Sequence, residues 1–82
     1  MLRLGENAVH ELDCKGLNCP MPIVRLSQAM RTLAAGESIT IFADDPAFRA
    51  DLEAWVRRFG HTITSFESTG RRLQQAVVTK NK

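Results

Sequence analysis

Residues 20–43, PMPIVRLSQAMRTLAAGESITIFA, contain a helical pattern followed by a strand pattern, and this succession indicates the fold class. Four apolar residues of the first half recur at helical spacing: Ile23, Leu26, Met30 and Leu33. They predict an amphipathic helix over residues 20–34, which Ala35-Gly36 should end. The branched and aromatic residues of SITIFA, 38–43, predict a strand directly after the turn.

The flanking segments continue the alternation. Residues 8–13, AVHELD, are short and mixed, and predict a first strand. After residue 43, Asp45 is expected to cap a second helix with Pro46 at its first position, and Gly60 is expected to end it. The apolar stripe of that helix is Phe48, Leu52, Trp55, Val56 and Phe59, and its polar face carries Arg49, Asp51, Glu53 and Arg57. Two further strands are predicted at 61–67 and 72–79, joined as an antiparallel hairpin by a tight turn at Ser68-Thr69-Gly70.

The resulting order is βαβαββ, which predicts an α/β protein of the α+β two-layer type. Two apolar helix stripes need one surface to cover, and a four-stranded mixed sheet supplies it. Right-handed crossovers favour both helices on the same face of that sheet. Because Thr40 and Phe42 alternate with Ile39 and Ile41, one of these pairs must face away from the helices.

Length and composition limit the function classes. The chain has 82 residues and a mass of 9.2 kDa, so we expect one domain over 1–82 with its core in about 8–79. A domain of this size argues against a large multi-step active site or a buried organic cofactor. No apolar run approaches the ~20 residues that span a bilayer. The first residues, MLRLGENAVHELD, lack a signal-peptide pattern, so a cytoplasmic location is the default expectation.

The net charge of +2 is unevenly distributed. Residues 71–82 contain no acidic residue and carry Arg71, Arg72, Lys80 and Lys82. Four scattered cations are a weak basis for nucleic-acid binding, and a solvated last strand is the preferred interpretation.

The segment before the first helix carries the chemistry. Pro20 and Pro22 belong to the first turn, where missing N–H groups leave no hydrogen bond unmade, so Cys19 should lie at or next to the N-cap. The helix dipole there favours a thiolate and should lower the thiol pKa, modestly because the prolines remove amide donors. The alternative is a buried, inert cysteine. Cysteine is a poor N-cap, however, and a proline-stiffened turn favours a thiol presented for reaction.

Cys19-Pro20-Met21-Pro22, preceded by Asp13, Gly16 and Leu17, resembles the CPxP signature of the TusA/SirA-like family of small sulfur-carrier proteins. Asp44-Asp45-Pro46 and Gly60-His61 also resemble that family, and the similarity runs over residues 8–79. The resemblance implies that Cys19 accepts sulfane sulfur as a persulfide and hands it to a partner protein. It also implies a supporting role for Asp13, Gly16 and the two prolines.

The implied partners are a sulfur-donor protein, such as a cysteine desulfurase or a rhodanese, and a sulfur-acceptor protein. Implied pathways are tRNA thiolation, molybdenum-cofactor metabolism and sulfur oxidation. The protein would be a sulfurtransferase-type carrier without independent turnover, cofactor, nucleic-acid contact or membrane contact. The alternative is a regulatory or protein-interaction module on the same fold, in which Cys19 is incidental.

Other candidate residues keep two interpretations each. Cys14 is either a second thiol that bridges or resolves Cys19, or a strand-end side chain. His10 and His61 with the two cysteines fit no common zinc spacing, so no metal is predicted. A cationic rim of Lys15, Arg25, Arg71 and Arg72 would steer acidic partners, or these side chains are merely solvated. Trp55 and Phe48 are expected in the core.

Overall fold

The computed structural model describes residues 10–69 and 72–82. The elements follow the predicted order: β1 (Glu11–Asp13), α1 (Met21–Met30), β2 (Ser38–Ala43), α2 (Phe48–Phe59), β3 (Thr62–Thr69) and β4 (Leu73–Thr79). Residues 8 and 9 of the predicted first strand lie outside the described residues, as do Gly70 of the predicted turn and Arg71 of the predicted rim.

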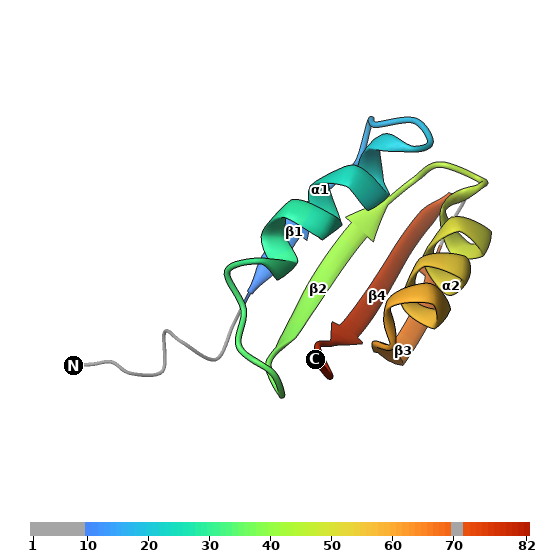
Figure 1. The fold of residues 1–82 in the computed structure, drawn as a ribbon. Coiled ribbons are helices and arrows are strands. Elements are labelled where there is room, and N and C mark those ends of the chain that lie inside the picture. The colour runs from blue at the N-terminus through green and yellow to red at the C-terminus, as the bar shows by residue number, and fades with distance from the viewer. Residues whose placement is uncertain (1–9, 70–71) are drawn as a thin grey trace.

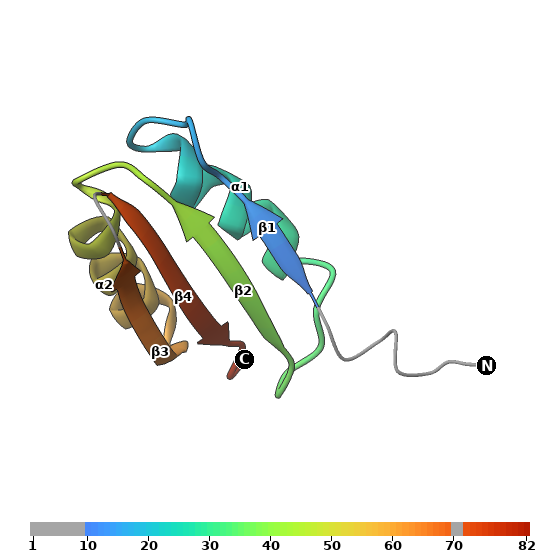
Figure 2. The ribbon, with the colours of Figure 1, turned by 180° about the vertical axis from the view of Figure 1, so that it is seen from behind.

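The four strands form one mixed sheet in the order β1-β2-β4-β3. β1 pairs with β2 in parallel, and β4 pairs antiparallel with both β2 and β3, with a register shift between Ile63 and Ser65. Both helices cover the same face of this sheet, and the other face is open when the molecule is seen from behind (Figures 1 and 2). The predicted α+β two-layer architecture is therefore confirmed.

The core lies between the helices and the sheet. Its buried members are Cys14, Leu26, Met30, Leu33, Ile39, Ile41, Ala43, Phe48, Leu52, Val56, Ala76 and Val78. Ile39 and Ile41 are thus the pair that faces the helices, whereas Thr40 and Phe42 are partly exposed on the opposite face. Burial of these apolar side chains is the main favourable contribution to folding.

The predicted end of the first helix is wrong. α1 ends at Met30, and the chain then continues through turns to β2. The carbonyl oxygens of Met30 and Leu33 accept hydrogen bonds from Nζ of Lys80, at 2.8 and 2.7 Å. The Met30 carbonyl also accepts from the Leu33 N–H at 3.2 Å, so it is paired without Gly36, which lies in the turn before β2.

The start of α2 is also shifted. Phe48 is the first helical residue, so Pro46 does not occupy the predicted first position and Asp45 is not the N-cap. Asp45 acts one turn earlier: its Oδ2 accepts from the Ala47 backbone N–H, and its carbonyl accepts from that of Phe48, both at 3.0 Å. Gly60 ends the helix as predicted, with a φ of 79°.

The sheet pairing places the two helix N-termini together. β1 and β2 are parallel, and each is followed by a helix that runs back along the sheet. The N-terminal ends of α1 and α2 therefore lie at the same edge of the molecule (Figure 1). Cys19, just before α1, and Asp51, in the first turn of α2, meet at this edge. Neither helix in the described part of the chain has the length and apolar character that a bilayer span requires.

Candidate functional site

The loop before Cys19 is fixed to the end of β2. The Cys14 backbone N–H donates to the Phe42 carbonyl at 2.7 Å, which extends the β1–β2 pairing by one residue. Gly16, with a φ of 85°, donates its N–H to both carboxylate oxygens of Asp44 at 3.0 and 3.1 Å. Asp13 Oδ1 accepts the N–H of Lys15 at 3.0 Å. These contacts involve Asp13 and Gly16 and connect the loop before Cys19 to Asp44, the residue that follows β2.

The two prolines occupy the first turn, as expected. Pro20 is the N-cap residue, and its carbonyl accepts from the N–H groups of Ile23 and Val24, both at 3.1 Å. Pro22 is the second helical residue and its ring is completely buried. Cys19 therefore lies directly before the N-cap, in an exposed turn. The sequence places the thiol at the start of the helix, and the structure agrees.

The partner of the thiol is Asp51, a residue in the first turn of α2. Cys19 Sγ donates to Asp51 Oδ2 at 2.7 Å. This hydrogen bond is the main reason why the pKa of Cys19 is raised above its ordinary value, and the negative charges of Asp51 and Asp45 act in the same direction. The predicted lowering of this pKa is therefore wrong: one carboxylate in contact outweighs a helix terminus that has lost amide donors to proline.

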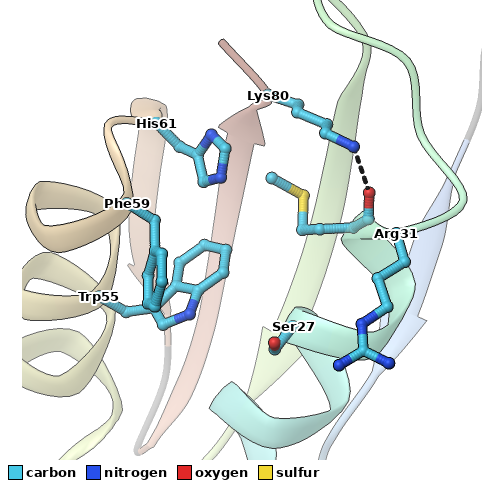
Figure 3. A pocket seen from close by; sticks show the side chains of 7 residues that line it. Ser27, Arg31, Trp55, Phe59, His61 and Lys80 are labelled. Atoms are coloured by element: carbon cyan, nitrogen blue, oxygen red, sulfur yellow. Dashed lines mark hydrogen bonds between the residues drawn. The ribbon is translucent and has the colours of Figure 1, made fainter. Parts of the chain in front are cut away.

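Cys19 opens into a groove between the two helices. About 290 Å³ of space is lined by Cys19, Pro20, Ile23, Asp51, Ala54, Trp55 and Arg58. Two further hollows continue along the helices, and Trp55 lines all three. The last hollow, of about 200 Å³, is bounded by Ser27, Arg31, Phe59, His61 and Lys80 around Trp55 (Figure 3). Trp55 is thus half-buried and forms a groove wall, whereas Phe48 is buried in the core as expected.

Cys14 belongs to the core. Its side chain is 0% exposed, and burial raises the pKa of its thiol, partly offset by the charge of Arg25. Both cysteines are free. The strand-end interpretation of Cys14 therefore fits the geometry, and a resolving role would require the core to open.

The two histidines lie in separate contacts. His10 Nε2 is 3.8 Å from Glu37 Oε2, whereas His61 Nδ1 accepts the Asn81 N–H at 3.2 Å and its ring lies 5.3 Å from that of Trp55. Within residues 10–69 and 72–82, no three His, Cys, Asp or Glu side chains are grouped so that they would hold a metal ion.

The described cations of the predicted rim are Lys15, Arg25 and Arg72. Lys15 is exposed, 3.8 Å from Asp13 Oδ2 and 5.8 Å from the centre of the Phe42 ring. Arg25 is exposed on α1 and its charge acts on Cys14, and Arg72 is exposed before β4. The cation that lines the Cys19 groove is Arg58 of α2.

Sequence reasoning missed three groove residues: Asp51, Trp55 and Arg58. The sequence pattern places Asp51 on the polar face of its helix and Trp55 in the core; Trp55 does pack against the core but also lines the groove. A usable signal did exist, since two right-handed βα units in succession bring both helix N-termini to one edge. An acidic residue in the first turn of the second helix then lies close to a cysteine that precedes the first helix.

Comparisons with known proteins show the family of the chain. The family model described as sulfurtransferase TusA matches residues 10–80. The chain belongs to this sulfurtransferase TusA family of sulfur carriers. A Bacillus subtilis (strain 168) protein named "Putative sulfur carrier protein YrkF" is 48% identical over 63 residues, which are 77% of this chain and 34% of that protein. The chain thus spans about a third of that relative.

The fold also has a solved counterpart. The crystal structure of a SirA-like protein from Desulfitobacterium hafniense superposes with a TM-score of 0.76 and 19% identity, covering 90% of this chain and 100% of the other. At this identity the likeness concerns the fold.

Proposed function

We propose that Cys19 accepts sulfane sulfur as a persulfide and passes it to a partner protein. The observation that carries this proposal is the contrast in exposure of the two thiols. Cys19 is exposed at the mouth of a groove, whereas Cys14 is enclosed in the core. A group that must meet one protein to be loaded and another to be unloaded has to be reachable from outside.

The chemistry needs only a nucleophilic sulfur. The Cys19 thiolate attacks the outer sulfur of a donor persulfide, and the donor thiol leaves, as in thiol–disulfide exchange. The resulting Cys19 persulfide is held on a loop that Asp44 ties to β2, which keeps it in one place for the acceptor. The residues of this chain thus position a reactive sulfur, and turnover resides in the donor and acceptor enzymes.

We further propose that the donor is a cysteine desulfurase or a rhodanese, and that the acceptor belongs to tRNA thiolation, molybdenum-cofactor metabolism or sulfur oxidation. We propose residues 1–82 as a single carrier domain and a cytoplasmic location, where reducing conditions keep both cysteines free. The loaded protein is incubated with one acceptor protein from each pathway. The acceptor that removes the sulfur from Cys19 identifies the pathway.

The decisive experiment is loading by a cysteine desulfurase with cysteine, followed by trapping and mass spectrometry. The expected product is a dithiothreitol-sensitive adduct of one sulfur atom on Cys19. Cys19→Ser should abolish it, and the matched variant Cys14→Ala should retain it. An adduct on Cys14 in the Cys19→Ser protein would contradict the assignment. Absence of an adduct on either cysteine of the unaltered protein would instead support an interaction module.

A further inference from the structure

The groove carries a negative charge next to Cys19, on the carboxylate of Asp51. Asp51 is half-buried, and its Oδ2 accepts the thiol proton at 2.7 Å. The ion pairs in the described part of the chain are His10–Glu37, Lys15–Asp13 and Arg49–Glu53, so Asp51 has no cation within 4.0 Å there. The neighbouring acid, Glu53, is exposed and already paired. The carboxylate of Asp51 therefore contacts the Cys19 thiol, whereas that of Glu53 contacts Arg49.

The other charged groups near Cys19 do not compensate. Asp45, in the turn before α2, adds a second negative field at the sulfur. Arg58 lines the same groove from α2, and Arg25 of α1 acts on Cys14. Ionising Cys19 would place a thiolate against a carboxylate, and like charges in contact disfavour the ionised form. The contact with Asp51 therefore favours the protonated thiol over the thiolate.

A protonated thiol is a poor nucleophile, yet loading requires a thiolate. A positive group that approaches Asp51 would reverse this preference, because the group pairs with the carboxylate and also stabilises the thiolate. We propose that Asp51 is a positioning residue that selects sulfur donors with a positively charged group beside the transferable sulfur. This inference rests on the proposed carrier function and adds the chemistry of the donor.

The transfer step balances without an external oxidant. Cys19 Sγ releases its proton to solvent as the donor cation pairs with Asp51. Sγ then bonds to the outer sulfur of the donor persulfide, the S–S bond of the donor breaks, and the donor leaves as a thiolate that takes up a proton. One sulfane sulfur moves from donor to Cys19, so one persulfide is consumed and one is formed.

Small disulfides of different charge test the selection without any partner protein. The probes are cystamine, which is cationic, 2-hydroxyethyl disulfide, which is neutral, and 3,3′-dithiodipropionate, which is anionic. Mixed-disulfide formation on Cys19 is followed by mass spectrometry at low ionic strength. We expect the cationic probe to react fastest and the anionic probe slowest. Asp51→Asn should reduce the cationic-to-anionic rate ratio by about tenfold, equivalent to about one pKa unit of electrostatic preference.

Two variants serve as controls. Glu53→Gln removes the same charge from the same helix without touching the thiol, and should leave the ratio unchanged. Asp51→Glu keeps the carboxylate, and should retain most of the ratio. The pH profile of alkylation by neutral iodoacetamide gives an independent readout, because Asp51→Asn should move its midpoint to lower pH. A purely structural role for Asp51 would not produce that shift.

The outcomes separate this inference from the proposed function. An unchanged rate ratio or pH midpoint in Asp51→Asn overturns the selection, as does an equal loss in Glu53→Gln, even if Cys19 accepts sulfur from a desulfurase. A collapsed ratio in Asp51→Asn with normal behaviour of both controls supports it. If Cys19 then fails to load from any persulfide donor, the carrier function is wrong while the electrostatic preference of the thiol remains.

Discussion

Cys14 and Cys19 lie at the two ends of one short loop, and the fold gives their thiols opposite surroundings. Cys14 extends the pairing of β1 with β2, which turns its side chain between the sheet and the helices. The loop then passes the Asp44 carboxylate and brings Cys19 out to the start of α1. The backbone path of residues 14–19 thus decides that one cysteine lies in the core and the other on the surface.

The pKa of both thiols is raised, but for different reasons. Burial dominates for Cys14, whereas the hydrogen bond to Asp51 dominates for Cys19. A partner can reverse the second cause by supplying a cation at the groove. It cannot reverse the first without opening the core. The cause of a shift therefore carries more functional information than its direction.

The largest expected difference is in alkylation rate. Under native conditions, iodoacetamide should modify Cys14 at least about 100-fold more slowly than Cys19. The reagent can reach Cys14 only after a local opening of the fold, whose free energy we expect to be about 3 kcal/mol. Peptide mapping by mass spectrometry after timed quenching gives both rates in one sample. In concentrated urea the two rates should converge. Similar native rates would show that the β1 end opens freely and that Cys14 is available as a second thiol.

The next contrast is in stability. Cys14→Ser places a hydroxyl in the core and should lower the free energy of unfolding by about 1–3 kcal/mol, whereas Cys19→Ser should change it by less than about 0.5 kcal/mol. Urea unfolding followed by circular dichroism measures both. Cys14→Ala is the matched control, since it removes the sulfur without adding a polar group. A serine variant as stable as the alanine variant would contradict complete enclosure of position 14.

The element order and the sheet architecture could be predicted because they follow from local patterns and general packing rules. Hydrophobic spacing located both helices. Strand alternation separated Ile39 and Ile41 from Thr40 and Phe42, but it did not show which pair meets the helices; the burial of Ile39 and Ile41 does. The end of α1 could not be found in this way. At that end Nζ of Lys80, which follows β4, donates to the carbonyls of Met30 and Leu33. A contact between segments so distant in sequence leaves no local trace.

The same limit applies to the site. The prolines and the turn before the helix pointed to Cys19, because these signals lie next to it in the chain. Asp51 lies on the other helix, and only the three-dimensional arrangement brings it to the thiol. The predicted pKa direction was wrong for that reason: the helix terminus was visible in the sequence, and the opposing carboxylate was not.

The smallest expected effect is on the free energy of unfolding when Pro22 or Val24 is replaced. These two residues of α1 differ in burial, as Cys14 and Cys19 do. The ring of Pro22 is fully buried, whereas Val24 is 38% exposed. Pro22→Ala should therefore lower the free energy of unfolding by about 1–2 kcal/mol, since two buried methylene groups are lost at about 0.8 kcal/mol each. Val24→Ala should change it by less than about 0.5 kcal/mol. Thermal and urea unfolding of both variants gives the comparison. If Pro22→Ala left stability unchanged but slowed sulfur transfer, the ring would serve to orient the Cys19 turn rather than to fill the core.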